Sequence, residues 1–277
     1  MENIPFTNIV YAFSLTLFAG LSTGIGAAIA FFTKPKDTKV LSFGMGFSAG
    51  VMIYISFAEI IVKSKDSFAL KFGENIGESL AVLCFFIGIL ISFLIDKLVP
   101  ADINPHELKT TSELRPLRHE EKISSSLLKR TGIITAIAIS IHNFPEGFAT
   151  FVASLDEIKI GVIIAFAVAI HNIPEGMAVS LPIFYATGDR KKAFKYAFFS
   201  GLAEPLGAII GFLIIAPILG DLTLGITFGI VAGIMVFISL DELIPSAKTY
   251  SDGHTAIFGV VFGMAIMAGS LLLFKLV

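Results

Sequence analysis

The amino-acid sequence predicts an all-α polytopic membrane protein with eight transmembrane helices in a 3+2+3 arrangement. Composition is the first reason: 55% of the 277 residues are hydrophobic, 15% are charged, and the mean hydropathy is +0.85. A soluble domain of this length is far less apolar. The second reason is a series of apolar segments of about 20 residues, the length that crosses a bilayer. The third is an internal repeat whose copies run through the membrane in opposite directions.

The whole chain, 1–277, is expected to form a single transmembrane domain. Its first apolar run lacks a basic N-terminal region and a cleavage site of small residues, so we expect a retained span rather than a signal peptide. The long connection at about 99–123 is rich in charge, Pro, Ser and Thr, which is typical of a loop. The expected spans cover about residues 6–32, 40–62, 77–98, 124–153, 158–185, 192–218, 223–246 and 254–276.

Charge distribution predicts the orientation. Of the 20 Lys and Arg residues, 15 lie on the side of the odd-numbered loops and 5 on the other side. Because positive residues favour the cytoplasm, we expect a multi-pass protein of the inner or plasma membrane with both termini outside the cytoplasm and the 99–123 loop inside it. The net charge of −2 offers no basic field for nucleic acid. A single cysteine, Cys84, excludes a disulfide within the chain.

The repeat relates the two ends of the chain. AGVMIYISFAEI at 49–60 matches AGIMVFISLDEL at 232–243, with six identities in twelve positions, and GLSTGIGAAIAFF at 20–32 matches GLAEPLGAIIGFL at 201–213. Each match joins an odd-numbered span to an even-numbered one, so the copies have inverted topology. The repeats cover about 6–98 and 192–276. This architecture is typical of transporters that open alternately to either side of a site at the bilayer midplane.

Two hexapeptides occupy the helices between the repeats, at about 124–185. HNFPEG lies at 142–147 and HNIPEG at 171–176. In each, His and Glu are four residues apart and share one helix face, while the proline before the Glu removes a backbone hydrogen bond. The turn between these helices is equally far from both histidines. Antiparallel packing should therefore bring the two copies to one level, with the glutamates within ~6 Å of that level.

The spans carry acids without a matching base. No Lys or Arg lies deep in a span, so the missing positive charge must be a transported cation, protons or both. Imidazole, carboxylate and amide ligands without thiolates suit Zn, Fe, Mn or Co. Glu204 precedes a proline in a third interrupted helix and stands where the matching repeat has Thr23. The acids are Glu59, Glu146, Glu175, Glu204, Asp241 and Glu242.

Other polar residues carry less weight. Glu59, Asp241 and Glu242 lie near span ends, where they are either entrance and exit ligands or capping acids. His106 and His119 lie in the loop and are expected to be solvated. Met52 and Met235 occupy matching repeat positions and are expected to pack rather than bind metal.

Together, the paired hexapeptides, the AEP segment and the SLDELIP sequence at the end of the seventh span resemble the ZIP family of divalent-metal transporters, particularly its bacterial ZupT type. The likeness covers all eight spans. It implies uptake of zinc and related metals into the cytoplasm, a two-metal site and a homodimer. By position, His142, Glu146, His171 and Glu175 resemble the first metal site, and Asn143, Glu146, Asn172, Glu175 and Glu204 the second.

The leading interpretation is a secondary transporter of Zn(II), with Fe(II), Mn(II) and Cd(II) as further substrates, that works by alternating access without a prosthetic group. ATP hydrolysis is not expected, since the chain has no GxxxxGK[ST] motif. One alternative is an intramembrane metalloenzyme, although HExxH is missing. Another is a proton or cation channel, which leaves the paired His and Asn without a purpose.

Overall fold

The computed structural model describes residues 5–32, 38–98, 125–215, 220–251 and 253–276, and in these residues all regular structure is helical. The predicted loop, with His106 and His119, lies outside the described residues. The helices are α1 (Phe6–Ala30), α2 (Thr38–Ile55), η1 (Ser56–Ile60), α3 (Ile61–Phe72), α4 (Glu74–Leu98), α6 (Ser125–Asp156), α7 (Ile158–Thr187), α8 (Arg190–Gly201), α9 (Ala203–Ile215), α10 (Asp221–Ile238), η3 (Ser239–Leu243), α11 (Ile244–Tyr250) and α12 (Thr255–Leu276).

Seven helical stretches in the described residues are long and apolar enough to cross a membrane. Many large apolar side chains on their outer faces are exposed, including Leu83, Phe86 and Leu213, as expected for a surface that meets lipid. Helix α6, which corresponds to the fourth expected span and carries the first hexapeptide, is not one of the seven. The stretches are Phe6–Ile29, Ser42–Phe72, Glu74–Lys97, Ile158–Thr187, Arg190–Ile214, Asp221–Lys248 and Thr255–Leu273.

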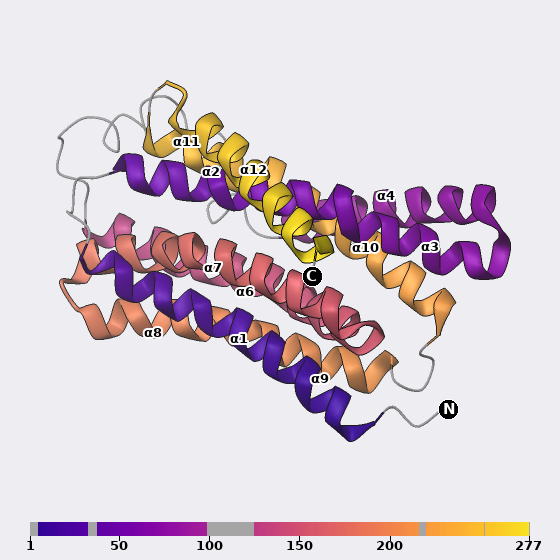
Figure 1. Cartoon of the computed structure of the whole chain (residues 1–277). Coiled ribbons are helices and arrows are strands. Elements are labelled where there is room, and N and C mark those ends of the chain that lie inside the picture. Colours follow the sequence, from indigo (N-terminus) through magenta and orange to yellow (C-terminus); the bar gives the residue numbers. More distant parts are fainter. Residues whose placement is uncertain (1–4, 33–37, 99–124, 216–219, 252, 277) are drawn as a thin grey trace.

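The helices form two groups (Figure 1). We call α1, α6, α7, α8 and α9 the hexapeptide group, which forms the lower layer in Figure 1. The companion group consists of α2, η1, α3, α4, α10, η3, α11 and α12. Packing is extensive inside each group, whereas contact between the groups runs mainly through α2 against α7 and α10 against α6. The fold therefore has one interface along which two packed units meet.

Local sequence explains where several helices begin and end. Helix α7 ends at Thr187. The next residue, Gly188, has a φ of 67°, in the left-handed region that glycine adopts without strain. Asp189 then caps α8 by accepting a hydrogen bond from the Lys192 N–H at 3.1 Å. Helix α3 ends at Gly73, with φ of 81°. These short signals produce the sharp turns that connect neighbouring spans.

One span differs from the sequence prediction in length, and another is interrupted where the sequence predicted. The second span was expected to end near residue 62, but η1 and α3 continue its helix to Phe72. The sixth is divided at Leu202 into α8 and α9, as the proline after Glu204 predicted, because Pro205 has no N–H to bond the carbonyl of Gly201.

Glycines let the helices cross closely. A Cβ added to Gly26 would lie 1.8 Å from the carbonyl oxygen of Ile173, so α1 and α7 touch backbone to backbone. In the companion group, a Cβ on Gly50 would lie 2.1 Å from the Val260 oxygen, where α2 crosses α12. Small residues at crossings are the usual way to pack helices tightly in a membrane, where lipid is as apolar as the side chains.

Candidate metal site

The two hexapeptides lie on α6 and α7, which pack side by side and are joined by a short turn. Both helices continue through the motif prolines, Pro145 and Pro174. Asn143, Glu146, His171, Asn172 and Glu175 have exposed fractions of 0% or 1%. The backbone of His142 belongs to α6, but its side chain lies outside the described residues.

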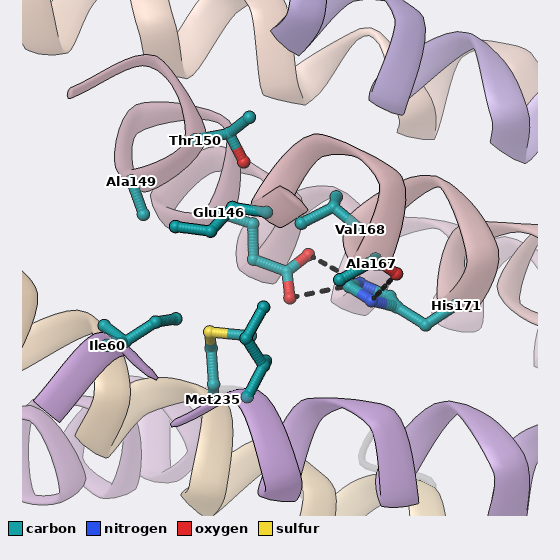
Figure 2. A pocket seen from close by; sticks show the side chains of 10 residues that line it. Ile60, Glu146, Ala149, Thr150, Ala167, Val168, His171 and Met235 are labelled. Carbon is teal, nitrogen blue, oxygen red and sulfur yellow. Dashed lines mark hydrogen bonds and ion pairs between the residues drawn. The ribbon is translucent and has the colours of Figure 1, made fainter. Parts of the chain in front are cut away.

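Glu146 and His171 meet across α6 and α7. Nε2 of His171 lies 3.3 Å from both carboxylate oxygens of Glu146 (Figure 2). On the other side of the ring, Nδ1 lies 3.1 Å from the carbonyl oxygen of Ala167. The predicted meeting of the two motifs at one level is therefore observed for this pair.

The hydrogen-bond chemistry of His171 defines what can lie between the two side chains. A carbonyl oxygen only accepts, so Nδ1 carries a hydrogen and donates it to Ala167. In the neutral ring, Nε2 then carries a lone pair, and a negatively charged carboxylate repels this lone pair. The contact with Glu146 thus requires a proton or a metal cation between nitrogen and oxygen. In metal sites a histidine is commonly oriented in this way, with its second nitrogen bonded to a carbonyl.

The two asparagines tie the motifs to the neighbouring helices. Nδ2 of Asn143 donates to the carbonyl oxygen of Ser200 in α8 at 3.3 Å, and Nδ2 of Asn172 donates to that of Ala19 in α1 at 2.9 Å. Asn172 also donates to Oε1 of Glu204. Glu204 is fully buried at the start of α9 and so belongs to the same site.

Several buried oxygens at this site have no hydrogen-bond partner among the described residues: Oδ1 of Asn143, Oδ1 of Asn172 and Oε2 of Glu204. Burying such atoms costs free energy unless a proton donor or a cation satisfies them. In the described part of the chain, no three His, Cys, Asp or Glu side chains converge closely enough to hold a metal ion. The described conformation brings the donor atoms near one another without closing a complete ligand shell.

A small cavity adjoins Glu146 and His171 at the interface between the two groups (Figure 2). From the hexapeptide group come Glu146, His171 and small or apolar residues such as Thr150 and Val168. The companion group contributes Ile55, Ile60 and Met235, so apolar side chains close this side of the site. Met235 packs here, as its sequence position indicated.

The three acids predicted near span ends lie in π-helical turns. Glu59 is in η1, and Asp241 and Glu242 are in η3; all three are half-buried. All three belong to the companion group. π-turns inside α-helices are frequent at functional sites.

Sequence reasoning did not identify the structural partners of the asparagines. Their acceptors, Ser200 and Ala19, are backbone carbonyls, which have no side-chain signature. The offset of 181 residues between them, equal to that between Gly20 and Gly201, was the one available signal.

Comparison with known proteins identifies relatives over nearly the whole chain. Residues 100–271 match the family described as ZIP Zinc transporter. The chain is 59% identical to the zinc transporter ZupT of Campylobacter jejuni, with 96% of this chain and 97% of the relative covered. It is 57% identical to the zinc transporter ZupT of Oceanobacillus iheyensis (96% and 98% covered) and 54% identical to that of Clostridium perfringens (96% and 97% covered).

Proposed function

The chain belongs to the ZIP zinc-transporter family, as its hexapeptides predicted, and from this premise we propose that it is a secondary transporter that moves divalent transition-metal ions into the cytoplasm. Zn(II) is the principal substrate, and Fe(II), Mn(II) and Cd(II) are further substrates. Its family members are transporters by name and not enzymes. The metalloenzyme alternative is therefore abandoned.

The contact between His171 and Glu146 carries the proposal. Two ligands of a tetrahedral zinc ion with bonds of about 2.0–2.1 Å lie about 3.3–3.4 Å apart. Nε2 of His171 and the oxygens of Glu146 are 3.3 Å apart. A zinc ion can thus enter between them with little movement of either side chain, in place of a proton.

The remaining ligands follow from the buried oxygens. We assign a two-metal site to the hexapeptides, with Glu146 and Glu175 bridging the ions. Metal binding supplies a partner for three buried oxygens that otherwise lack one: the amide oxygens of Asn143 and Asn172 and Oε2 of Glu204. The proposed ligands are His142, Asn143, Glu146, His171, Asn172, Glu175 and Glu204.

The proposed protein crosses the membrane eight times, with α6 as the fourth span and both termini outside the cytoplasm. Two copies form a homodimer in the cell membrane. An inverted repeat is supported by matching contacts. A Cβ on Gly233 would lie 2.0 Å from the Phe85 oxygen where α10 crosses α4, just as Gly50 meets Val260 where α2 crosses α12. Each pair joins a span of one repeat to a span of the other.

Alternating access then results from movement of the hexapeptide group against the companion group. Only a limited interface joins the two groups, which supports such a movement. On entry, the ion displaces protons from the Glu and His side chains, because metal ligands bind in their deprotonated forms. Glu59 on one side and Asp241 and Glu242 on the other act as entrance and exit ligands.

Metal uptake into proteoliposomes tests the function. We expect saturable uptake of Zn(II) by the wild type and a loss of at least roughly 100-fold in Glu146→Ala, whose truncated side chain leaves Nε2 of His171 without its facing carboxylate. Parallel assays with Fe(II), Mn(II) and Cd(II), with and without a pH gradient, order the substrates and test proton coupling. Equal uptake by both proteins would contradict the proposed site, and large conductance without metal dependence would favour a channel.

A further inference from the structure

Helices α1 and α9 meet the two hexapeptide helices through matching contacts. A Cβ on Gly176 of α7 would lie 1.9 Å from the carbonyl oxygen of Thr23 in α1. One on Gly147 of α6 would lie 2.1 Å from that of Glu204 in α9. Gly176 and Gly147 each end a hexapeptide, and Thr23 and Glu204 are equivalent in the repeat. The crossing of α1 over α7 is therefore equivalent to the crossing of α9 over α6.

The asparagine hydrogen bonds obey the same equivalence. Asn172 donates to the carbonyl oxygen of Ala19 at 2.9 Å, and Asn143 donates to that of Ser200 at 3.3 Å. Ala19 and Ser200 are separated by 181 residues, like Thr23 and Glu204. Each motif asparagine thus binds the same backbone position of its repeat, four residues before Thr23 or Glu204.

The equivalence ends in the side chains of Thr23 and Glu204. Oε1 of Glu204 accepts a hydrogen bond from Asn172. Thr23 has an exposed fraction of 0%, and its Oγ1 has no hydrogen-bond partner in the described residues. A buried threonine of a helix commonly satisfies its hydroxyl on its own backbone. Thr16, two turns earlier in α1, does so by donating to Ala12 at 3.0 Å.

The Thr23 hydroxyl lies toward the Asn143 end of the site. A Cβ added to Gly201 would be 2.9 Å from Oγ1 of Thr23. Gly201 directly follows Ser200, whose carbonyl oxygen binds Nδ2 of Asn143. The amide oxygen of Asn143 is itself buried without a hydrogen-bond partner among the described residues. Thr23 and Asn143 thus each carry a buried neutral oxygen without a partner in the described residues, and both side chains lie next to the Ser200–Gly201 backbone.

Building on the transport function proposed above, we propose that Oγ1 of Thr23 is a further ligand of the two-metal site, beside Oδ1 of Asn143 on the α1 side. Thr23 is the counterpart in the repeat of Glu204, which accepts a hydrogen bond from Asn172 on the α9 side. Because Thr23 and Asn143 are neutral ligands, the α1 side of the site holds a cation more weakly than the side with Glu204. Cation binding is therefore asymmetric in the site, stronger beside α9 and weaker beside α1.

The donor chemistry makes Thr23 a specificity-determining residue. Hydroxyl and amide oxygens are hard ligands, which suit Mn(II) better than the softer Cd(II). Removal of the hydroxyl should weaken the binding of Mn(II) more than that of Cd(II). Thr23→Val preserves the shape of the side chain and removes the oxygen, whereas Thr23→Ser preserves the oxygen.

Direct metal titration of the purified full-length protein, followed by uptake assays, tests whether Thr23 binds the metal. For Thr23→Val we expect a Kd for Mn(II) raised about tenfold and a Kd for Cd(II) raised less than about threefold, with KM for uptake following the same order. Thr23→Ser should retain wild-type values. Thr16→Val is the matched control, since it removes an equally buried hydroxyl of α1 that is already bonded to its own helix.

Unchanged Mn(II) binding in Thr23→Val, or an equal loss in Thr23→Ser, would overturn the inference. If Thr23→Val does not reach the membrane, Thr23→Ala removes the hydroxyl without adding bulk and takes its place. The proposed function is tested separately by Glu146→Ala. Flux that is lost in Glu146→Ala but identical in Thr23→Val and wild type would leave the transporter assignment standing and reject only the role of Thr23.

Discussion

The hexapeptide group and the companion group are both built from helices that cross at glycines, yet they bury different polar side chains. Every buried Asn, His and Glu among the described residues lies on α6, α7 or α9 of the hexapeptide group. The companion group buries hydroxyls instead. Ser56 and Ser239, for example, donate to the carbonyl oxygens of Met52 and Met235, each at 2.7 Å.

This difference assigns separate tasks to the two groups. A hydroxyl bonded to its own helix is satisfied whether or not an ion is present. Buried carboxylates and amides need a cation or protons, and their free energy therefore depends on what the site holds. We infer that the ion binds in one group, while the other forms the surface against which that group moves.

The largest effect is expected from neutralising the site. Glu204→Gln keeps the volume of the side chain and the hydrogen bond from Asn172, but the amide cannot lose a proton and become a charged ligand as a carboxyl group can. Uptake of Zn(II) should fall roughly 100-fold, measured in proteoliposomes. Glu78→Gln is the control in the companion group, because Glu78 is exposed and paired with Lys65 at 3.2 Å. It should retain uptake within about twofold. Similar losses of Zn(II) uptake in both variants would contradict the assignment of ion binding to the hexapeptide group alone.

Glycine crossings should matter equally in the two groups. In Gly26→Ala, the new Cβ would lie 1.8 Å from the Ile173 oxygen, so α1 and α7 must separate. Overpacking of this kind costs about 1–3 kcal/mol, and we expect the thermal midpoint in detergent to fall by about 5–10 °C. Gly50→Ala, 2.1 Å from the Val260 oxygen, should cause a comparable fall in the companion group.

Gly24→Ala is the control for these crossings. Its Cβ would meet the ring of Phe198 at 3.4 Å, an ordinary van der Waals contact. Alanine is also a better helix former than glycine, by about 1 kcal/mol. The thermal midpoint of Gly24→Ala should therefore not fall below that of the wild type. A midpoint for Gly26→Ala equal to that of Gly24→Ala would mean that α1 and α7 lie further apart than described.

The smallest effect is expected at an ion pair that joins the two groups. Lys63 of α3 lies 3.1 Å from Glu157 and 4.0 Å from Asp156, at the turn between α6 and α7. These side chains are partly exposed, and such pairs contribute about 0–1 kcal/mol. Lys63→Met should therefore change the uptake rate by about threefold at most, and less at high salt because charge pairs are screened.

The matched control is Lys65→Met. Its ion pair with Glu78 lies inside the companion group, between α3 and α4, and does not cross the interface. We expect no salt-dependent change in its uptake rate. If the rates of Lys63→Met and Lys65→Met depend on salt to the same degree, the ion pair does not restrain movement between the groups.

Part of the site was accessible from sequence because its signals are local. The four-residue spacing of His and Glu placed them on one helix face, and the equal distance of both motifs from the turn at 156–157 predicted that α6 and α7 would bring them together. The contact between Glu146 and His171 agrees with this. The binding of metal by the seven predicted ligands stays a prediction.

Other features of the site could not be read from the chain. The bonds from Asn143 to Ser200 and from Asn172 to Ala19 depend on how α1 and α8 cross the hexapeptide helices. The apolar closure by Ile60 and Met235 depends on how the companion group lies against α6 and α7. Such contacts join residues far apart in sequence, and backbone acceptors carry no residue signature.

By itself, the sequence determined the all-helical class and the apolar spans, and it predicted which residues bind metal, because hydropathy, proline and four-residue spacing act within one helix. Only the tertiary structure decided the division into two groups, the continuation of the second span to Phe72 and the place of the Thr23 side chain next to Gly201. The physical reason is that membrane helices are selected by their own burial in lipid. Their neighbours are selected by close packing, which depends on the shapes of two surfaces at once.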